Sequence, residues 1–352
     1  MSQNPKKPKL AISVGDVNGV GVEIILKSHK EISSLCEPIY CAHKALFLKA
    51  LKHLKNTQDF ETLVSKNMRF SPPHNARIPQ VSPSTLQKAS GKYSFASFMH
   101  GLDLVDTSKA DAVVTLPIQK AAWKKAGLHY AGHTQVLRHR YKKDAIMMLG
   151  CEEMLVALFT EHIPLKSVSA SISIDKYVSF LIALYRSFNF EEALVLGFNP
   201  HCGDSGAIGG KEDKKIQSAI KKANKFFKKE IFYGIVPPDS AFTPANRARF
   251  SLFIAPYHDI GLATLKALYF EKSINVSLNL PIIRTSVDHG VAYDIAYKGV
   301  ASTQSYKNAV AFAIKMINEK QHIKDKISKV SLRTQIPNHT PHHTPNDAPN
   351  HT

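Results

Sequence analysis

The chain has 352 residues, of which 44% are hydrophobic. This length exceeds the usual size of a single hydrophobic core, so we expect two domains that share a cleft. The longest candidate for a membrane segment, residues 178–184, is far shorter than the roughly 18 apolar residues that a spanning helix needs. The basic N-terminus leads into a short strand and not into a secretory signal, so we expect a cytoplasmic protein without a membrane partner.

The formal net charge of +18 is spread over several separate clusters of Lys and Arg. No recognisable nucleic-acid-binding module accompanies them, so we interpret them as solvated helix faces and expect no nucleic-acid partner. A basic surface would also attract anionic substrates. The four cysteines form no CxxC pair, which fits a reducing compartment. The clusters lie at 6–9, 138–143, 211–229 and 320–333.

Apolar runs that end at polar or glycine residues predict buried strands. In chain order they are residues 10–14, 110–117, 193–198 and 252–256. Helical spacing of Ile216, Ile220, Ala223 and Phe227 predicts an amphipathic helix over residues 212–229. Strands that alternate with helices indicate a doubly wound α/β architecture.

The first predicted strand runs into a glycine loop at residues 15–21, and a helix is expected to begin near Glu23. The loop lacks the G-x-G-x-x-G order, and no acidic residue is visibly placed to hold a ribose. A phosphate cradle and a plain strand-to-helix turn are therefore equally compatible with it.

Five polar segments lie mostly next to strand ends or glycine turns, where α/β enzymes build their sites. Each contains a histidine, and His162, His201 and His258 each follow an apolar strand-like run. Three imidazoles at one sheet edge would leave a metal with an open position, as catalytic sites require. No short spacing such as HExxH links two of them, so structural histidines remain an equal alternative. The segments are 132–135, 160–165, 199–206, 257–261 and 284–290.

The C-terminal residues from Pro337 onward form a four-residue near-repeat with almost no apolar side chains. Such a segment cannot bury a core, so we expect residues 335–352 to be a disordered tail. Its histidines could bind metal adventitiously; they are His339, His342, His343 and His351.

Together, six ordered motifs over about residues 10–305 resemble the 4-hydroxythreonine-4-phosphate dehydrogenases of pyridoxal phosphate biosynthesis. They are GDVNGVGVEI, GHT, TEHIPL, GFNPHCGDSGAIGGKE, YHDIGLATLK and NVSLNLPIIRTSVDHGVAYDIA. The resemblance implies two α/β/α domains with a cleft between them, as in isocitrate and isopropylmalate dehydrogenases. We expect residues 1–126 with 290–334 to form one domain and residues 127–289, with the metal and substrate residues, to form the other.

The same resemblance implies roles for individual residues. His162, His201 and His258 would bind one divalent ion (zinc, magnesium or cobalt), at a site shared across a homodimer. The substrate would contact His133, Thr134, Lys266, Asn275 and Arg284, with Lys266 also the candidate catalytic proton carrier. An adenosine-binding segment would include Asp288, Gly290, Ala292 and Asp294, for NAD or NADP. Tyr297 and the pair Val17-Asn18 depart from the residues common in the family.

The activity implied is NAD-dependent oxidation of 4-phosphooxy-threonine (4-hydroxythreonine 4-phosphate), followed by decarboxylation to 3-amino-2-oxopropyl phosphate. Two alternatives stay open from the motifs. One is a paralogous dehydrogenase of another phosphorylated hydroxy acid, and the other is a non-redox metal-dependent hydrolase or lyase that binds no dinucleotide.

Overall fold

A computed structural model describes residues 6–55 and 58–333 of the chain. The chain divides into two compact units, Met1–Ile317 and Asn318–Thr352, and the fold below is that of the first. The predicted disordered tail, with its four histidines, lies outside the described residues.

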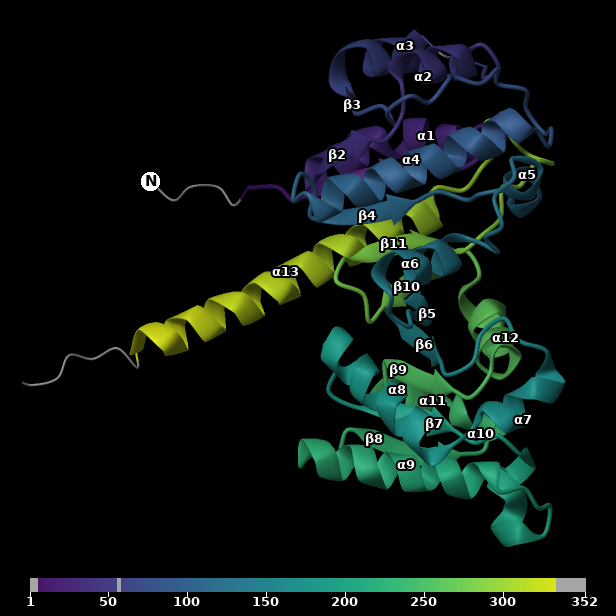
Figure 1. The fold of residues 1–352 in the computed structure, drawn as a ribbon, viewed down its shortest axis with the longest axis vertical. Helices are drawn as coiled ribbons and strands as arrows, with labels where there is room; N and C mark the ends of the chain where they lie inside the picture. Colours follow the sequence, from purple (N-terminus) through teal and green to yellow (C-terminus); the bar gives the residue numbers. More distant parts are fainter. Residues whose placement is uncertain (1–5, 56–57, 334–352) are drawn as a thin grey trace, which may run out of the picture. The chain divides into compact units, whose positions relative to one another are not determined.

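One sheet of eleven strands forms the centre of the first unit (Figure 1). The strands are β1 (Lys9–Ser13), β2 (Glu37–Tyr40), β3 (Arg69–Phe70), β4 (Ala112–Thr115), β5 (Ile146–Cys151), β6 (Met154–Leu158), β7 (Ala193–Leu196), β8 (Phe232–Val236), β9 (Leu252–Ala255), β10 (Ile274–Leu278) and β11 (Arg284–Val287). Their order across the sheet is β3-β2-β1-β4-β11-β10-β5-β6-β9-β7-β8.

The sheet has two parallel halves that run in opposite directions. Strands β3, β2, β1, β4 and β11 are mutually parallel, as are β6, β9, β7 and β8. Between the halves, β10 is antiparallel to both β11 and β5, and β5 is antiparallel to β6. The carboxyl ends of the two halves therefore lie at opposite edges of the sheet.

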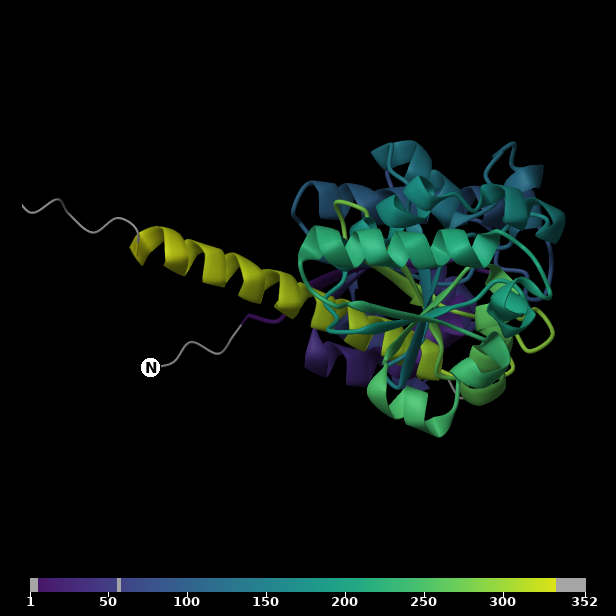
Figure 2. The same cartoon turned by 90° about the horizontal axis from the view of Figure 1, so that it is seen from below.

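Helices connect the strands and cover both faces of the sheet (Figure 2). The described α-helices are α1 (Gly21–Leu35), α2 (Lys44–Leu51), α3 (Gln58–Thr62), α4 (Lys88–Asp106), α5 (Lys120–Lys125), α6 (His133–Tyr141), α7 (Val168–Ser171), α8 (Ile174–Ser187), α9 (Glu212–Phe227), α10 (Pro238–Ala241), α11 (Pro244–Arg249), α12 (His258–Tyr269) and α13 (Gln304–Arg333). Three short helices of other types are η1 (Leu63–Asn67), η2 (Leu165–Ser167) and η3 (Pro200–Gly206).

Alternate strand residues enter different cores, as the two-residue period of a strand requires. On β1, Leu10 and Ile12 join the largest apolar cluster, which also holds buried residues of α1, α8, α9 and α13. Ala11 points to the opposite face and packs with residues of α4 and α6. Both faces of the strands are buried, which explains why the strands read as continuous apolar runs.

The elements predicted from periodicity are present. The four predicted strands correspond to β1, β4, β7 and β9, and the predicted amphipathic helix is α9. The mixed α/β class with a largely parallel sheet is confirmed. The proposed domain boundaries near residues 126 and 289 stay a prediction, because one sheet runs through both parts and residues 1–317 cluster as one unit.

Among the described residues, no single helix is long and apolar enough to cross a membrane. One bent pair of helices, Leu165–Ser171 with Ile174–Ser187, is long and apolar enough by length and composition, with 93° between its two parts.

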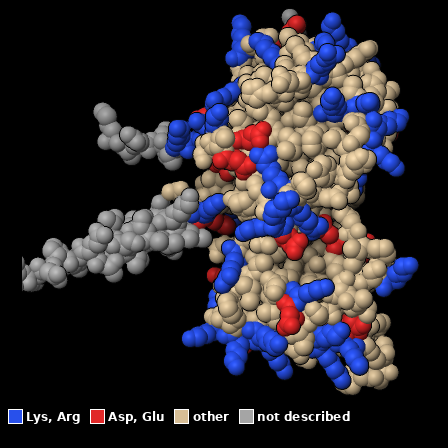
Figure 3. Space-filling model, in the orientation of Figure 1, with Lys and Arg blue, Asp and Glu red and all other residues tan. Residues whose placement is uncertain are grey.

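On the face shown in Figure 3, Lys and Arg side chains are distributed over many elements and do not gather in one patch.

Candidate active site

Two of the three predicted metal-binding histidines lie side by side at one edge of the sheet. His162 follows β6 and His258 follows β9, and these two strands are parallel neighbours. Their carboxyl ends therefore meet, and the centroids of the two imidazole rings are 5.5 Å apart. The expectation that parallel strands would bring histidines together is confirmed for this pair.

Each of these imidazoles has a carboxylate beside its Nδ1 atom. Asp259 Oδ1 lies 2.7 Å from Nδ1 of His258, and Glu161 Oε2 lies 3.8 Å from Nδ1 of His162. Arg138 forms an ion pair with Glu161 and donates to the carbonyl of Ala145 at 2.8 Å, which holds that carboxylate in place. A carboxylate at Nδ1 favours the tautomer whose Nε2 is free to ligate a metal.

The donor chemistry of this pair fits a divalent ion. Two imidazoles on one tetrahedral ion hold their ring centroids roughly 5 Å apart, given metal–nitrogen distances of about 2 Å. Burial is the largest cause that lowers the pKa of His162, so its neutral form is favoured, and only neutral imidazole ligates. Zinc and cobalt both accept such ligands.

His201 is not part of this pair in the single chain. It lies in η3 after β7, and the backbone from His201 to Ser205 has positive φ throughout, with φ of 50° at His201. This left-handed turn leaves the His201 side chain exposed. Among the described residues, no group of three His, Cys, Asp or Glu side chains could hold a metal.

Arg284 forms the centre of a buried cluster of polar side chains that contains no carboxylate from the described part of the chain. It is 2% exposed, and its guanidinium donates to Asn275 Oδ1 at 3.2 Å, Ser277 Oγ at 3.1 Å and Thr115 Oγ1 at 2.8 Å. Its Nε is buried without a hydrogen-bond partner among the described residues. Burial lowers the pKa of Arg284 to about 9. A buried guanidinium without a carboxylate partner among the described residues is suited to bind an anion.

The start of α6 faces this guanidinium. His133 is the first residue of α6, and its Nδ1 lies 3.2 Å from Nη2 of Arg284. Its Nε2 is buried without a partner among the described residues. The first N–H groups of a helix have no intrahelical acceptor and attract anions. Thr134 follows on the same turn, so the predicted substrate residues His133, Thr134, Asn275 and Arg284 come together.

Residues that the sequence did not indicate also belong to this cluster or lie near it. Lys120, at the start of α5, contributes to lowering the pKa of both His133 and His162. Its Cε is 3.6 Å from the position that a Cβ on Gly132 would occupy. Thr115 is the last residue of β4 and Ser277 lies on β10. A single hydroxyl side chain within a strand forms no recognisable sequence motif. For Glu161 and Asp259 a signal existed, because each directly adjoins a predicted ligand in the chain.

The predicted catalytic residue Lys266 is paired with the predicted cofactor residue Asp288. Their ion pair is only partly exposed, with 26% of the Lys266 and 12% of the Asp288 side chain accessible. Lys266 Nζ also donates to the Asp288 carbonyl at 3.1 Å, and Ser273 Oγ donates to the carboxylate at 2.6 Å. Lys266 is eight residues beyond His258 on α12, so the helix advances about 12 Å between them.

The predicted adenosine-binding segment packs on the first glycine loop. Val20 N donates to the Val291 carbonyl at 3.0 Å, and a Cβ on Gly19 would lie 2.6 Å from that carbonyl oxygen. The Tyr297 hydroxyl donates to the Val17 carbonyl at 2.6 Å. Both residues differ from those common in the family, so two unusual positions are in contact. Both segments follow parallel strands of one half, β1 and β11, which explains their meeting.

Within this segment, Gly290 and Asp294 are exposed and Ala292 is half-buried with φ of 44°. His289, the histidine of the polar segment 284–290, lies between Asp288 and Gly290 and has no predicted role. Its Nε2 is buried without a partner among the described residues, and burial lowers its pKa. An exposed carboxylate next to a glycine loop is compatible with a ribose contact.

Proteins with assigned names are similar to this chain over most of its length. Residues 34–313 match the family described as pyridoxal phosphate biosynthetic protein PdxA. A 4-hydroxythreonine-4-phosphate dehydrogenase of Campylobacter fetus is 52% identical over 311 residues, covering 88% of this chain and 98% of the relative. The protein of that name from Helicobacter pylori strain J99 is 46% identical and covers 87% and 99%, respectively.

Solved structures agree with these sequence matches. A 4-hydroxythreonine-4-phosphate dehydrogenase from Klebsiella pneumoniae has a TM-score of 0.72 at 26% identity and covers 89% of this chain and 100% of that one. The corresponding enzyme from Burkholderia phymatum has a TM-score of 0.70 at 28% identity, with coverage of 88% and 98%. The sequence and the fold together show that the chain belongs to the PdxA family of pyridoxal phosphate biosynthetic proteins.

Proposed function

We propose that this chain is a 4-hydroxythreonine-4-phosphate dehydrogenase that acts in pyridoxal phosphate biosynthesis. Its relatives at 45–52% identity carry that name over nearly their full length. The observation that supports it best is the cluster of Arg284 and His133 at the start of α6, which is suited to the phosphate of such a substrate.

The proposed reaction has two steps. The C–H bond at the substrate's secondary alcohol breaks, a hydride passes to NAD, and the hydroxyl proton is released, so a β-keto acid forms. The bond to its carboxylate then breaks, carbon dioxide leaves, and the remaining carbanion takes up a proton to give 3-amino-2-oxopropyl phosphate. The nicotinamide cofactor is the oxidant, and the decarboxylation needs no further oxidant.

A divalent ion would be held by His162, His258 and His201, where as a Lewis acid it would lower the pKa of the substrate hydroxyl and stabilise negative charge. Arg284, His133 and Thr134 would bind the phosphate, and Asn275 would orient the Arg284 guanidinium through its 3.2 Å hydrogen bond. We propose Lys266, on the helix that begins at His258, as the proton carrier.

For the cofactor we propose NAD, with NADP as the alternative, at Asp288, Gly290, Ala292 and Asp294. The exposure of Gly290 and Asp294 supports the assignment, because both remain accessible to a ligand. We further propose a cytoplasmic location for the enzyme.

We also propose that the enzyme is a homodimer with shared active sites. The support is the arrangement of the histidines. The imidazole centroids of His162 and His258 are 5.5 Å apart, while His201 is exposed and is not part of this pair. A two-fold related chain could supply the missing third ligand, since an isologous interface presents the same surface twice.

The test is an assay of NADH formation by the purified protein, loaded with zinc, cobalt or magnesium. We expect turnover with 4-hydroxythreonine 4-phosphate and release of carbon dioxide in equal amount. Faster turnover of a four-carbon sugar-acid phosphate would favour a paralogous dehydrogenase, and hydrolysis or elimination without NAD binding would favour a hydrolase or lyase. Full activity of the metal-stripped protein would contradict the proposal.

A further inference from the structure

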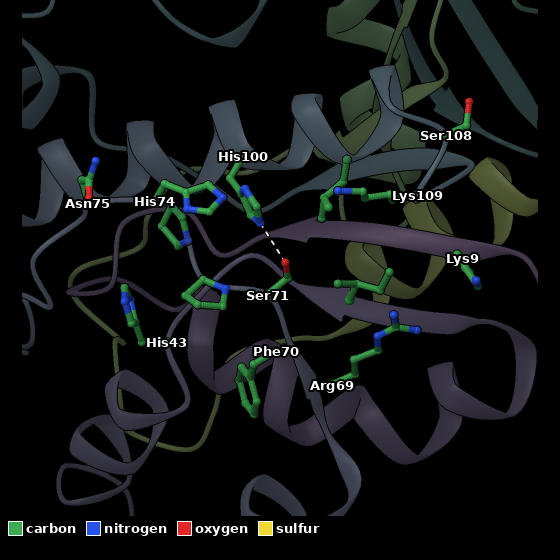
Figure 4. A pocket seen from close by; sticks show the side chains of 14 residues that line it. Lys9, His43, Arg69, Phe70, Ser71, His74, Asn75, His100, Ser108 and Lys109 are labelled. Atoms are coloured by element: carbon green, nitrogen blue, oxygen red, sulfur yellow. Dashed lines mark hydrogen bonds between the residues drawn. The ribbon is translucent and has the colours of Figure 1, made fainter.

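A basic cavity lies at the opposite end of the sheet from β8, next to the edge strand β3 (Figure 4). Its volume is about 770 Å³, within the range of small-molecule sites. It is lined from β1, β2, β3, the segment after β3, and α4 with the turn that follows it. None of the residues assigned above to substrate, metal or cofactor lines it.

Three cations gather at one end of this cavity. They are Lys9 at the start of β1, Arg69 on β3 and Lys109 after α4 (Figure 4). Among the described residues, the Nζ atoms of Lys9 and Lys109 have no hydrogen-bond or ion-pair partner. Arg69 has one long contact, 3.8 Å to Glu37, and both side chains of that pair are exposed.

Negative charge is nearly absent from the wall. None of the described residues that line the cavity is Asp or Glu. Asp111 is engaged by the backbone N–H of Lys9 at 2.7 Å, and Asp103 by Arg140 at 2.6 Å. Within the described residues, the lining therefore carries three cations and no carboxylate, a charge distribution that attracts an anion.

Imidazole and hydroxyl groups line the other end. His74 and His100 meet edge to face with centroids 5.9 Å apart, and Ser71 Oγ lies 2.8 Å from Nε2 of His100. His43 Nδ1 lies 3.0 Å from the Tyr93 hydroxyl, so its other ring nitrogen remains free among the described residues. Neutral groups with both donors and acceptors are suited to hydroxyl or amide groups of a ligand.

Because cations line one end of the cavity and imidazoles the other, we propose that it binds a small phosphate monoester. The phosphate would lie between Lys9, Arg69 and Lys109. The polar organic part would lie toward His43, His74 and His100. The site is distinct from the Arg284 cluster, since the two share no residue. It would be occupied independently of the proposed dehydrogenase reaction.

NMR of the full-length protein with labelled histidine rings tests this, because His100 reports on the cavity and not on Arg284. Inorganic phosphate and glycerol 3-phosphate would be titrated separately at constant pH and ionic strength, with the His100 signal assigned from His100→Asn. We expect a saturable shift of that signal. The double variant Arg69→Gln with Lys109→Gln should weaken binding about tenfold or more, since each charge-assisted contact is strong.

The matched control is Lys92→Gln, an exposed lysine of α4 that does not line the cavity. It should bind as the unaltered protein does. Tighter binding of glycerol 3-phosphate than of inorganic phosphate supports a monoester, whereas equal affinity would assign the site to free phosphate and overturn that part. No saturable shift, or equal weakening in the double variant and the control, would overturn the site itself.

Discussion

Nη2 of Arg284 lies 3.2 Å from Nδ1 of His133, and no carboxylate forms an ion pair with either group among the described residues. Two adjacent groups that would repel if both were charged are held together inside the protein. Burial is the largest cause that lowers the pKa of His133, followed by the charges of Arg284 and Lys120. This neutral imidazole beside a buried cation leads to the first two predictions.

The first prediction concerns stability at acidic pH. The pKa of His133 is well below the value of 6.5 that it has when unfolded, so below pH 6.5 the unfolded chain binds a proton that the folded chain does not. His133 therefore contributes a loss of stability as pH falls below 6.5, by up to about 1.4 kcal/mol per pH unit. Chemical denaturation between pH 7 and 5, without phosphate, should show a shallower loss for His133→Gln. An unchanged slope would contradict this.

The second prediction separates binding from stability at Arg284. Its desolvation is offset by contacts with neutral groups and not by a carboxylate of the described residues, so Arg284→Met should change the free energy of unfolding by no more than about 1 kcal/mol. Substrate turnover should fall at least about a hundredfold, because the phosphate loses a charge-assisted partner. Denaturation curves and steady-state kinetics check the two parts. A stability loss as large as the activity loss would show that Arg284 is chiefly structural.

A third prediction compares two carboxylates of the proposed cofactor segment. Asp288→Asn removes the partner of partly buried Lys266, so the free energy of unfolding should fall by about 1–3 kcal/mol. Asp294 is exposed, so Asp294→Asn should leave stability unchanged and raise the KM for NAD. Thermal unfolding and kinetics at varied NAD distinguish them. A KM for NAD that does not change with Asp294→Asn would contradict the proposed ribose contact.

The fourth prediction tests the shared metal site by subunit mixing. His201→Ala and His258→Ala should each be inactive and lose metal, but dimers formed from both should contain one complete site. Random mixing should then restore about a quarter of the activity, since half of the dimers are mixed and each has one intact site. Mixing His162→Ala with His258→Ala should restore none, because those two ligands belong to the same chain. Recovery in the second mixture, or none in the first, would contradict the arrangement.

The chain's own sequence determined the α/β class and most of the local structure. Buried strands of a parallel sheet are apolar on both faces, so β1, β4, β7 and β9 stand out as continuous runs, and the apolar stripe of α9 is equally plain. The motifs also pointed to the histidines, because reactive side chains in such folds follow the strands. These patterns are local, so they can be recognised without knowing which strands are neighbours in the sheet.

Only the tertiary structure decided which of those residues meet. The order β6-β9-β7 and the shared strand direction brought His162 to His258, whereas the left-handed turn after β7 left His201 outside the pair. The pairing of Lys266 with Asp288 and the position of Lys120 near His133 and His162 depend on contacts between elements. Such contacts are set by packing between residues far apart in the chain, and a single sequence contains no local pattern for them.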